Sequence, residues 1–192
     1  MHFFDRKRRR SGNIAYLYTM KRILNTKFWL IVSVIAALVS CRGPKDADSE
    51  YAADMLKKGE AIPAFSLKDR SGILHTQADF AGKYVVYDFW ATWCPDCRAD
   101  LPSMKELYAR YGEKAVFVGV SFDTDPEKLD AYVAENGIGW MQLSDFVAKK
   151  ESAVGDAFRI RWIPSMYLVD PEGKVMLGTV MVNKLAAALE AL

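Results

Sequence analysis

The chain has 192 residues, of which 51% are hydrophobic, 26% charged and 12% aromatic, and this composition is typical of one folded domain and not of a disordered or collagen-like chain. The net charge of +2 hides an asymmetry, because residues 1–40 carry eight Lys/Arg and one Asp, whereas the remainder carries a net charge of −5. The folded part therefore gives no support to binding of nucleic acid or another polyanion.

Residues 1–40 are predicted to be an upstream segment followed by an export signal. Basic residues between 21 and 27 precede an apolar run over 28–39. A helix of that length rises about 18 Å, which is well short of the roughly 30 Å hydrocarbon core, so a membrane-spanning anchor is disfavoured. Met20 heads a conventional signal and is the expected start of the protein.

The signal ends at Cys41. The segment Leu38-Val39-Ser40-Cys41 resembles the lipobox of bacterial lipoproteins, and the resemblance implies that Cys41 becomes the lipidated first residue of a mature envelope protein. Cleavage by the ordinary signal peptidase and a buried Cys41 are the alternatives. Polar residues 41–60 are then expected to form a tether, and residues 61–192 the folded domain.

The pattern beyond residue 61 predicts an α/β domain. Expected strands, rich in β-branched and aromatic residues, cover 65–67, 73–75, 84–90, 115–120, 166–169 and 174–179. Expected helices cover 95–111, 126–136 and 185–192. Because strand and helix alternate between 84 and 120, the strands there should pair in parallel through right-handed crossovers. The turn at 170–173 should join the last two strands in an antiparallel hairpin.

Two cysteines three residues apart carry the candidate chemistry. Cys94-Pro95-Asp96-Cys97 follows a predicted strand and opens a predicted helix. The free N–H groups and the dipole at a helix start favour an anion, so the pKa of the Cys94 thiol should be lowered. A thiolate there can attack a disulfide, and Cys97, one turn along, can resolve the product. Pro95 suits the first helical position because it has no N–H to leave unpaired.

Two structural interpretations of the cysteine pair are weaker. A structural disulfide between residues three apart would close so small a loop that it removes little chain entropy. A structural zinc site needs four ligands, and Cys41, His2 and His75 do not supply a second pair at suitable spacing. No metal or cofactor is therefore expected.

Two segments of the chain resemble a known family. Residues 85–98 resemble the thioredoxin active-site segment, and residues 158–165 resemble its cis-proline segment. With the N-terminal hairpin and the export signal, the chain is similar to the TlpA/ResA-like branch of the AhpC/TSA redoxin superfamily, which contains thiol-disulfide oxidoreductases of the bacterial envelope. The resemblance implies a thioredoxin fold with a central mixed sheet, flanking helices and an extra N-terminal β-hairpin.

The resemblance also implies roles for residues near the thiols. Cys94 would be the nucleophile and Cys97 the resolving thiol. Pro164 would follow a cis peptide bond, beside which the backbone of Ile163 could pair with an extended substrate. An apolar rim would be formed by Trp93, Trp162 and Ile163, with ordinary core packing as the alternative for the two tryptophans.

Three acids lie close to the cysteines in the sequence. Asp88 stands where thioredoxin has its buried acid, although TlpA/ResA-like proteins often have Asn there; burial should raise its pKa and let it take the proton of Cys97. A structural acid is the alternative. Asp100 stands where the branch commonly carries Glu, and a solvated helix acid is an equal interpretation. Asp96 adds a negative charge to the helix start, which should favour the reducing direction.

These observations predict a lipid-anchored reductase of disulfide-containing client proteins, among which cytochrome apoproteins are one possibility. A reductant outside the cytoplasm needs electrons from a membrane thiol donor. A peroxiredoxin-like thiol peroxidase is one alternative, but that class has Thr three residues before the reactive cysteine, where Ala91 stands here. A redox-inert, membrane-tethered binding module is the other alternative.

Overall fold

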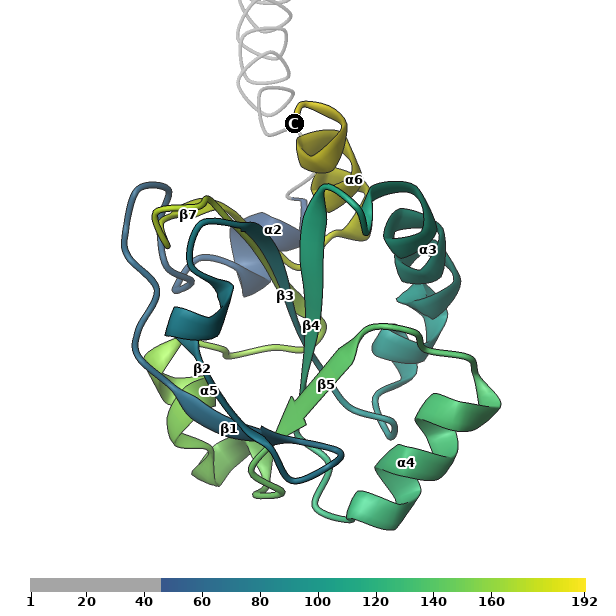
Figure 1. Cartoon of the computed structure of the whole chain (residues 1–192). Coiled ribbons are helices and arrows are strands. Elements are labelled where there is room, and N and C mark those ends of the chain that lie inside the picture. The colour runs from purple at the N-terminus through teal and green to yellow at the C-terminus, as the bar shows by residue number, and fades with distance from the viewer. Residues whose placement is uncertain (1–45) are drawn as a thin grey trace, which may run out of the picture. The chain divides into compact units, whose positions relative to one another are not determined.

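The computed structural model describes residues 46–192, which form a mixed sheet with helices on its two faces (Figure 1). The strands are β1 (Ser66–Asp69), β2 (Leu74–Thr76), β3 (Tyr84–Trp90), β4 (Ala115–Ser121), β5 (Met141–Ser144), β6 (Ser165–Val169) and β7 (Val175–Thr179). Their order in the sheet is β2-β1-β5-β4-β3-β6-β7. The pairs β3–β4 and β4–β5 are parallel and the other pairs are antiparallel. The predicted α/β class, the parallel central pair and the final hairpin are confirmed.

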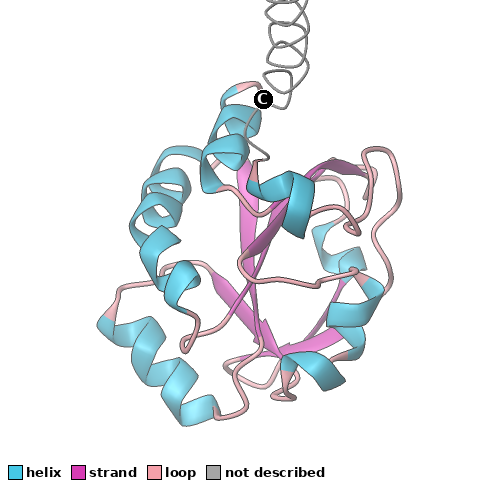
Figure 2. Ribbon diagram, turned by 180° about the vertical axis from the view of Figure 1, so that it is seen from behind, coloured by secondary structure: helices cyan, strands magenta, loops and turns pink. Residues whose placement is uncertain are grey.

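The helices are α2 (Ala47–Tyr51), α3 (Pro95–Tyr111), α4 (Pro126–Glu135), α5 (Ala153–Ala157) and α6 (Val182–Glu190), with short 3-10 helices at Gln77–Phe80 and Lys149–Glu151. Helices α3 and α4 lie on one face of the sheet, and α5 with the first 3-10 helix lies on the other (Figures 1 and 2). Helix α4 begins as predicted, because Asp125 accepts hydrogen bonds from the N–H groups of Glu127 and Lys128.

The alternation of side chains along β3 determines which residues face the active-site helix. Tyr87 points to the α5 face, where its ring lies 5.8 Å from that of Phe158. Trp90 points to the opposite face, where its ring lies 5.8 Å from that of Tyr132 in α4. Because side chains two residues apart share a face, Asp88 lies on the same side as Trp90, under α3.

Several elements differ from the prediction, including helix α2 and the two 3-10 helices, which were not predicted. Strand β5 was not predicted; it has only four residues, and its buried Gln142 accepts a hydrogen bond of 2.9 Å from the Trp90 indole. Helix α5 was also missed, because five residues carry too little periodicity to be recognised. Helix α6 begins at Val182, three residues before the predicted start.

The folded domain begins before residue 61, where the sequence places its start. The predicted tether over residues 41–60 is therefore wrong for residues 46–60, which are part of the domain. Asp46 caps α2 by accepting the Ser49 N–H. Further along, Met55 and Leu56 are buried, and the Leu56 N–H donates to the Tyr167 hydroxyl at 2.9 Å. The segment is polar in composition, but these few apolar residues are enough to fix it on the core.

The carboxylate of Asp48 connects α2 to the C-terminal part of the domain. It accepts hydrogen bonds from the Thr179 hydroxyl and the Val180 N–H, each at 2.8 Å. It also pairs with the Lys184 ammonium at 2.6 Å. Residues more than 130 positions apart are thereby held together.

The predicted export signal, the start at Met20 and the lipidation of Cys41 fall on residues 1–45 and lie outside the described residues. Within residues 46–192, none of the helices has the length and apolar character needed to cross a membrane.

We expect Asp48→Ala to lower the free energy of unfolding by about 1–3 kcal/mol, because it leaves buried donors without an acceptor. Urea unfolding followed by tryptophan fluorescence measures the change. Glu50→Ala, at an exposed acid of the same helix, is the control and should shift stability by less than about 0.5 kcal/mol. Equal effects of the two substitutions would contradict the proposed connection.

Candidate active site

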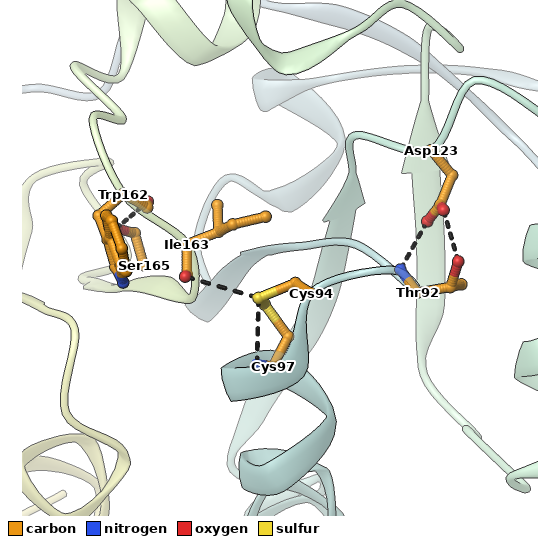
Figure 3. Close-up of a disulfide and its surroundings, with 7 residues drawn as sticks. All are labelled: Thr92, Cys94, Cys97, Asp123, Trp162, Ile163 and Ser165. Atoms are coloured by element: carbon orange, nitrogen blue, oxygen red, sulfur yellow. Dashed lines mark hydrogen bonds between the residues drawn. A yellow bond between two sulfur atoms is a disulfide. The ribbon is translucent and has the colours of Figure 1, made fainter.

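The two cysteines lie at the junction of β3 and α3 and form a disulfide (Figure 3). Cys94 is the N-cap residue of α3, and its sulfur accepts the N–H of Cys97 at 3.2 Å. Pro95 occupies the first helical turn, as predicted. Only 4% of Cys94 and 6% of Cys97 is exposed. The helix start therefore presents its N–H groups to a sulfur that lies just below the surface.

A proline loop faces the disulfide. The Ile163–Pro164 peptide bond is cis, as the family resemblance implies. The carbonyl oxygen of Ile163 lies 3.6 Å from Sγ of Cys94 (Figure 3). The Ser165 hydroxyl donates to the carbonyl of Trp162 at 2.8 Å and so fixes the loop on both sides of the proline. The structure thus brings Cys94 and Ile163, which are 69 residues apart, into contact.

Exposed aromatic side chains flank the disulfide. Trp93 is 57% exposed and Trp162 is 42% exposed, whereas Ile163 is buried. Ordinary core packing is therefore the wrong interpretation for both tryptophans. Tyr51 from α2 packs on Trp162 with 4.6 Å between ring centroids, and sequence reasoning missed this residue because it lay in the supposed tether. The aromatic residue in an otherwise polar segment was the available signal.

Asp88 is buried in β3, with 8% of its surface exposed. Burial, and secondarily the negative charge of Asp100, raise the pKa of the Asp88 carboxyl to about 7. Asp88 and the resolving cysteine both line a narrow cavity, with about 10 Å³ open to the centre of a water molecule, which is room for about one water. Its lining consists of Asp88, Trp90, Cys97, Leu101, Met104, Ile138, Trp140, Pro164 and Met166.

The other two acids, Asp96 and Asp100, both lie in α3 and differ in how exposed they are. Asp96 is exposed in the first turn. Asp100, one turn further, is half-buried, and burial together with the charge of Asp96 raises the pKa of its carboxyl. The negative charge of Asp100 contributes to the raised pKa of Asp88.

A buried acid that the sequence did not reveal holds the loop before Cys94. Asp123 accepts hydrogen bonds from the Thr92 N–H at 3.0 Å and from the Thr92 hydroxyl at 2.6 Å (Figure 3). It also accepts from the Ser121 hydroxyl at 2.7 Å. The Thr92 hydroxyl is therefore directed at Asp123, and Ala91, at the position where a peroxidase has Thr, offers no hydroxyl. This geometry disfavours the peroxidase alternative.

The sulfur pair is sufficient for the chemistry of disulfide exchange, which needs a thiolate and a second thiol and no bound cofactor. Within residues 46–192, no three His, Cys, Asp or Glu side chains are grouped so that they could hold a metal ion.

A disulfide between residues three apart at a helix start, facing a cis-proline at the end of a central sheet, defines a thiol-disulfide oxidoreductase of the thioredoxin fold. The comparisons agree with this class. The AhpC/TSA family matches residues 58–177, and the chain belongs to this family.

Among characterised relatives, the thiol-disulfide oxidoreductase ResA of Oceanobacillus iheyensis is 34% identical over 151 residues, covering 76% of this chain and 73% of ResA. The thioredoxin-like protein YneN of Bacillus subtilis is 32% identical and covers 62% of this chain and 69% of YneN. Among solved structures, the thioredoxin domain of a thiol-disulfide oxidoreductase from Bacteroides vulgatus is 30% identical, with a TM-score of 0.64 over 71% of this chain and 97% of that domain.

The raised pKa of Asp88 predicts a pH-dependent stability. Between about pH 4 and pH 7 the folded state holds a proton that the unfolded chain has released, so the stability of the wild type falls as the pH rises through this range. Asn at position 88 has no proton to release in this range, so Asp88→Asn removes this fall in stability. We expect its stability relative to the wild type to increase by about 2–3 kcal/mol between pH 4.5 and pH 8.

Urea unfolding of the oxidised proteins at both pH values measures the difference. Glu106→Gln, which removes an exposed acid from α3, is the control and should show no such increase. The burial argument fails if Asp88→Asn and Glu106→Gln respond to pH in the same way.

Proposed function

We propose that this chain is a lipid-anchored reductase of protein disulfides in the bacterial cell envelope. The observation that carries the proposal is the Cys94–Cys97 pair at the start of α3, next to the loop of Pro164 and between two exposed tryptophans. This arrangement combines a reactive sulfur with a surface that can receive a polypeptide.

In the first step the Cys94 thiolate attacks one sulfur of a client disulfide. A bond forms between Sγ of Cys94 and that sulfur, the client S–S bond breaks, and the other client sulfur leaves as a thiolate that takes a proton from solvent. The N–H of Cys97 and the helix dipole stabilise the thiolate before the attack. The product is a mixed disulfide.

In the second step Cys97 resolves the mixed disulfide. Its thiol gives its proton to the Asp88 carboxylate, directly or through one water in the cavity that both residues line, and its sulfur then attacks Sγ of Cys94. The Cys94–client bond breaks and the second client thiolate leaves. Two electrons have passed from the dithiol to the client, and the protein is left as the disulfide. With a pKa of about 7, Asp88 can both accept and release this proton near neutral pH.

The surface around Cys94 suits an extended client segment. The backbone of Ile163 lies beside the sulfur, so a client strand can pair with it as a short strand addition. Trp93 and Trp162 then cover the client on both sides, with Tyr51 supporting Trp162.

The proposal also includes the direction of electron flow, which is from the dithiol to the client disulfide. Asp96 places a negative charge in the same helical turn as the thiolate, which destabilises the reduced form relative to a neutral residue and favours donation of electrons. The oxidised protein then needs a membrane thiol donor to return it to the dithiol.

The envelope location is supported by the export signal and by the lipobox-like segment that ends at Cys41. Lipidation at Cys41 would place the anchor five residues before Asp46, the first residue held by the domain.

We expect Cys97→Ala to accumulate mixed disulfides with client proteins, because Cys94 can attack but the product cannot be resolved. Cys94→Ala should trap none, and wild type should reduce a protein disulfide with dithiothreitol as the electron source. Non-reducing electrophoresis of envelope extracts measures trapping. The proposed function would be contradicted if the wild type had no disulfide-reducing activity or if the two variants trapped client proteins equally.

For the anchor, we expect the wild type expressed in a bacterium to partition into the detergent phase with Cys41 at its N-terminus. Cys41→Ala should be soluble or unprocessed, because the acylated residue is missing. Detergent phase separation and mass spectrometry of the N-terminus measure this. Detergent-phase wild type that begins at Met1 or Met20 would refute lipidation.

A further inference from the structure

A groove of about 360 Å³ opens beside Cys94. Its apolar walls include Trp93, Trp162 and Ile163, and its charged residues are Asp96, Lys149 and Arg161. Two cations therefore line the same groove as the reactive cysteine, in a chain that carries a net charge of −5 from residue 41 onward.

Lys149 is the cation that the fold holds most firmly in this groove. Its ammonium donates to the carbonyl oxygen of Arg161 at 2.9 Å, which fixes it to the loop that precedes Pro164. The side chain is half-buried. Burial, and then the charge of Arg161, lower the pKa of Lys149, and the carboxylate of Asp156 offsets part of this effect. The groove thus holds a partly desolvated ammonium.

Among the lysines of residues 46–192, only Lys149 and Lys184 are half-buried, and Lys184 has carboxylate partners whereas Lys149 has none. Lys128 pairs with Asp125, Lys150 with Glu151, and Lys184 with Asp46 and Asp48. Lys149 forms no ion pair with a carboxylate among residues 46–192. An ammonium that is half-buried without such a partner costs stability, and a bound carboxylate would recover that cost.

The remaining charges of the groove are arranged differently. Arg161 is exposed and lies 3.9 Å from both Asp54 and Asp156, so part of its charge is already matched. Asp96 lies in the first turn of α3, which is a different element from the Lys149–Arg161 pair. The groove therefore has one acidic residue from α3 and a basic side, and only Lys149 on the basic side lacks a carboxylate partner.

We propose that Lys149 is a specificity residue that binds the carboxylate of an Asp or Glu side chain next to the reactive cysteine of the client polypeptide. This inference rests on the proposed disulfide reductase function and names its preferred class of substrate. The client backbone lies along Ile163 while its acidic side chain turns toward Lys149.

The test uses two peptide disulfides that are identical except for Glu or Gln on both sides of the reactive cysteine. We expect wild type to reduce the Glu peptide with a KM about two- to fivefold lower than that of the Gln peptide, the range of a partly screened ion pair. The preference should decline between 50 mM and 500 mM salt, to the extent that added salt screens the pair.

Substitutions at Lys149 and at the adjacent Lys150 show which lysine causes the preference for the Glu peptide. Lys149→Gln should lose the preference, and Lys149→Glu should reverse it toward a peptide with Lys at the same positions. Lys150→Gln is the matched control, because it removes an exposed lysine one residue away, and it should keep the wild-type preference.

The outcomes separate the inference from the function on which it rests. Wild type that reduces neither peptide overturns the reductase function. Wild type that reduces both with equal KM overturns the role of Lys149 alone. If Lys149→Gln slows both peptides equally and raises the pKa of the Cys94 thiol, Lys149 serves the thiolate and the specificity role is overturned. The salt dependence of wild type tests the charge preference even if a variant fails to fold.

Discussion

The first turn of α3 offers unpaired N–H groups to a single sulfur, and the rest of the site is arranged around this interaction. The N–H of Cys97 reaches Sγ of Cys94, which requires the chain to leave β3 and enter the helix without a long loop. Asp123 secures that short connection through Thr92. On the other side, the loop of Pro164 brings a backbone carbonyl to the same sulfur. These contacts form together because β3 lies between β4 and β6 in the sheet.

Burial of Asp88 has a thermodynamic cost, and the proposed reaction makes use of the raised pKa that this burial produces. Asp88 lies where α3 excludes water, so its ionised form is destabilised and its pKa approaches neutrality. The cavity that Asp88 and Cys97 both line has room for about one water. A solvated acid would keep its ordinary pKa and would be a weak acceptor for a thiol proton at neutral pH. Burial of the Asp88 side chain therefore lowers the stability of the domain near neutral pH, while in the proposed reaction it makes Asp88 a better acceptor for the Cys97 proton.

Helix α2, near the start of the described domain, connects the C-terminal part of the domain to the active site. Asp48 holds α2 against Thr179, Val180 and Lys184, and Tyr51 at the end of that helix supports Trp162 beside the disulfide. A segment that composition assigns to a tether thus helps to form the proposed client surface. In the proposed function, the charged groove on the same surface would add selectivity by charge to the general affinity that exposed aromatic rings provide.

Local patterns in the sequence predicted the α/β class, the boundaries of β3 and α3 and the cysteine pair, because strand alternation, helix capping and a three-residue spacing are local properties. The expected position of Asp88 followed from the resemblance to thioredoxin. The cis bond before Pro164 followed from resemblance to a family and not from local preference. Only the tertiary structure brought Tyr51 to Trp162, Asp123 to Thr92 and Lys149 to the groove of Cys94. These contacts join segments 31 to more than 100 residues apart, and they depend on how the sheet orders its strands, which no local pattern encodes.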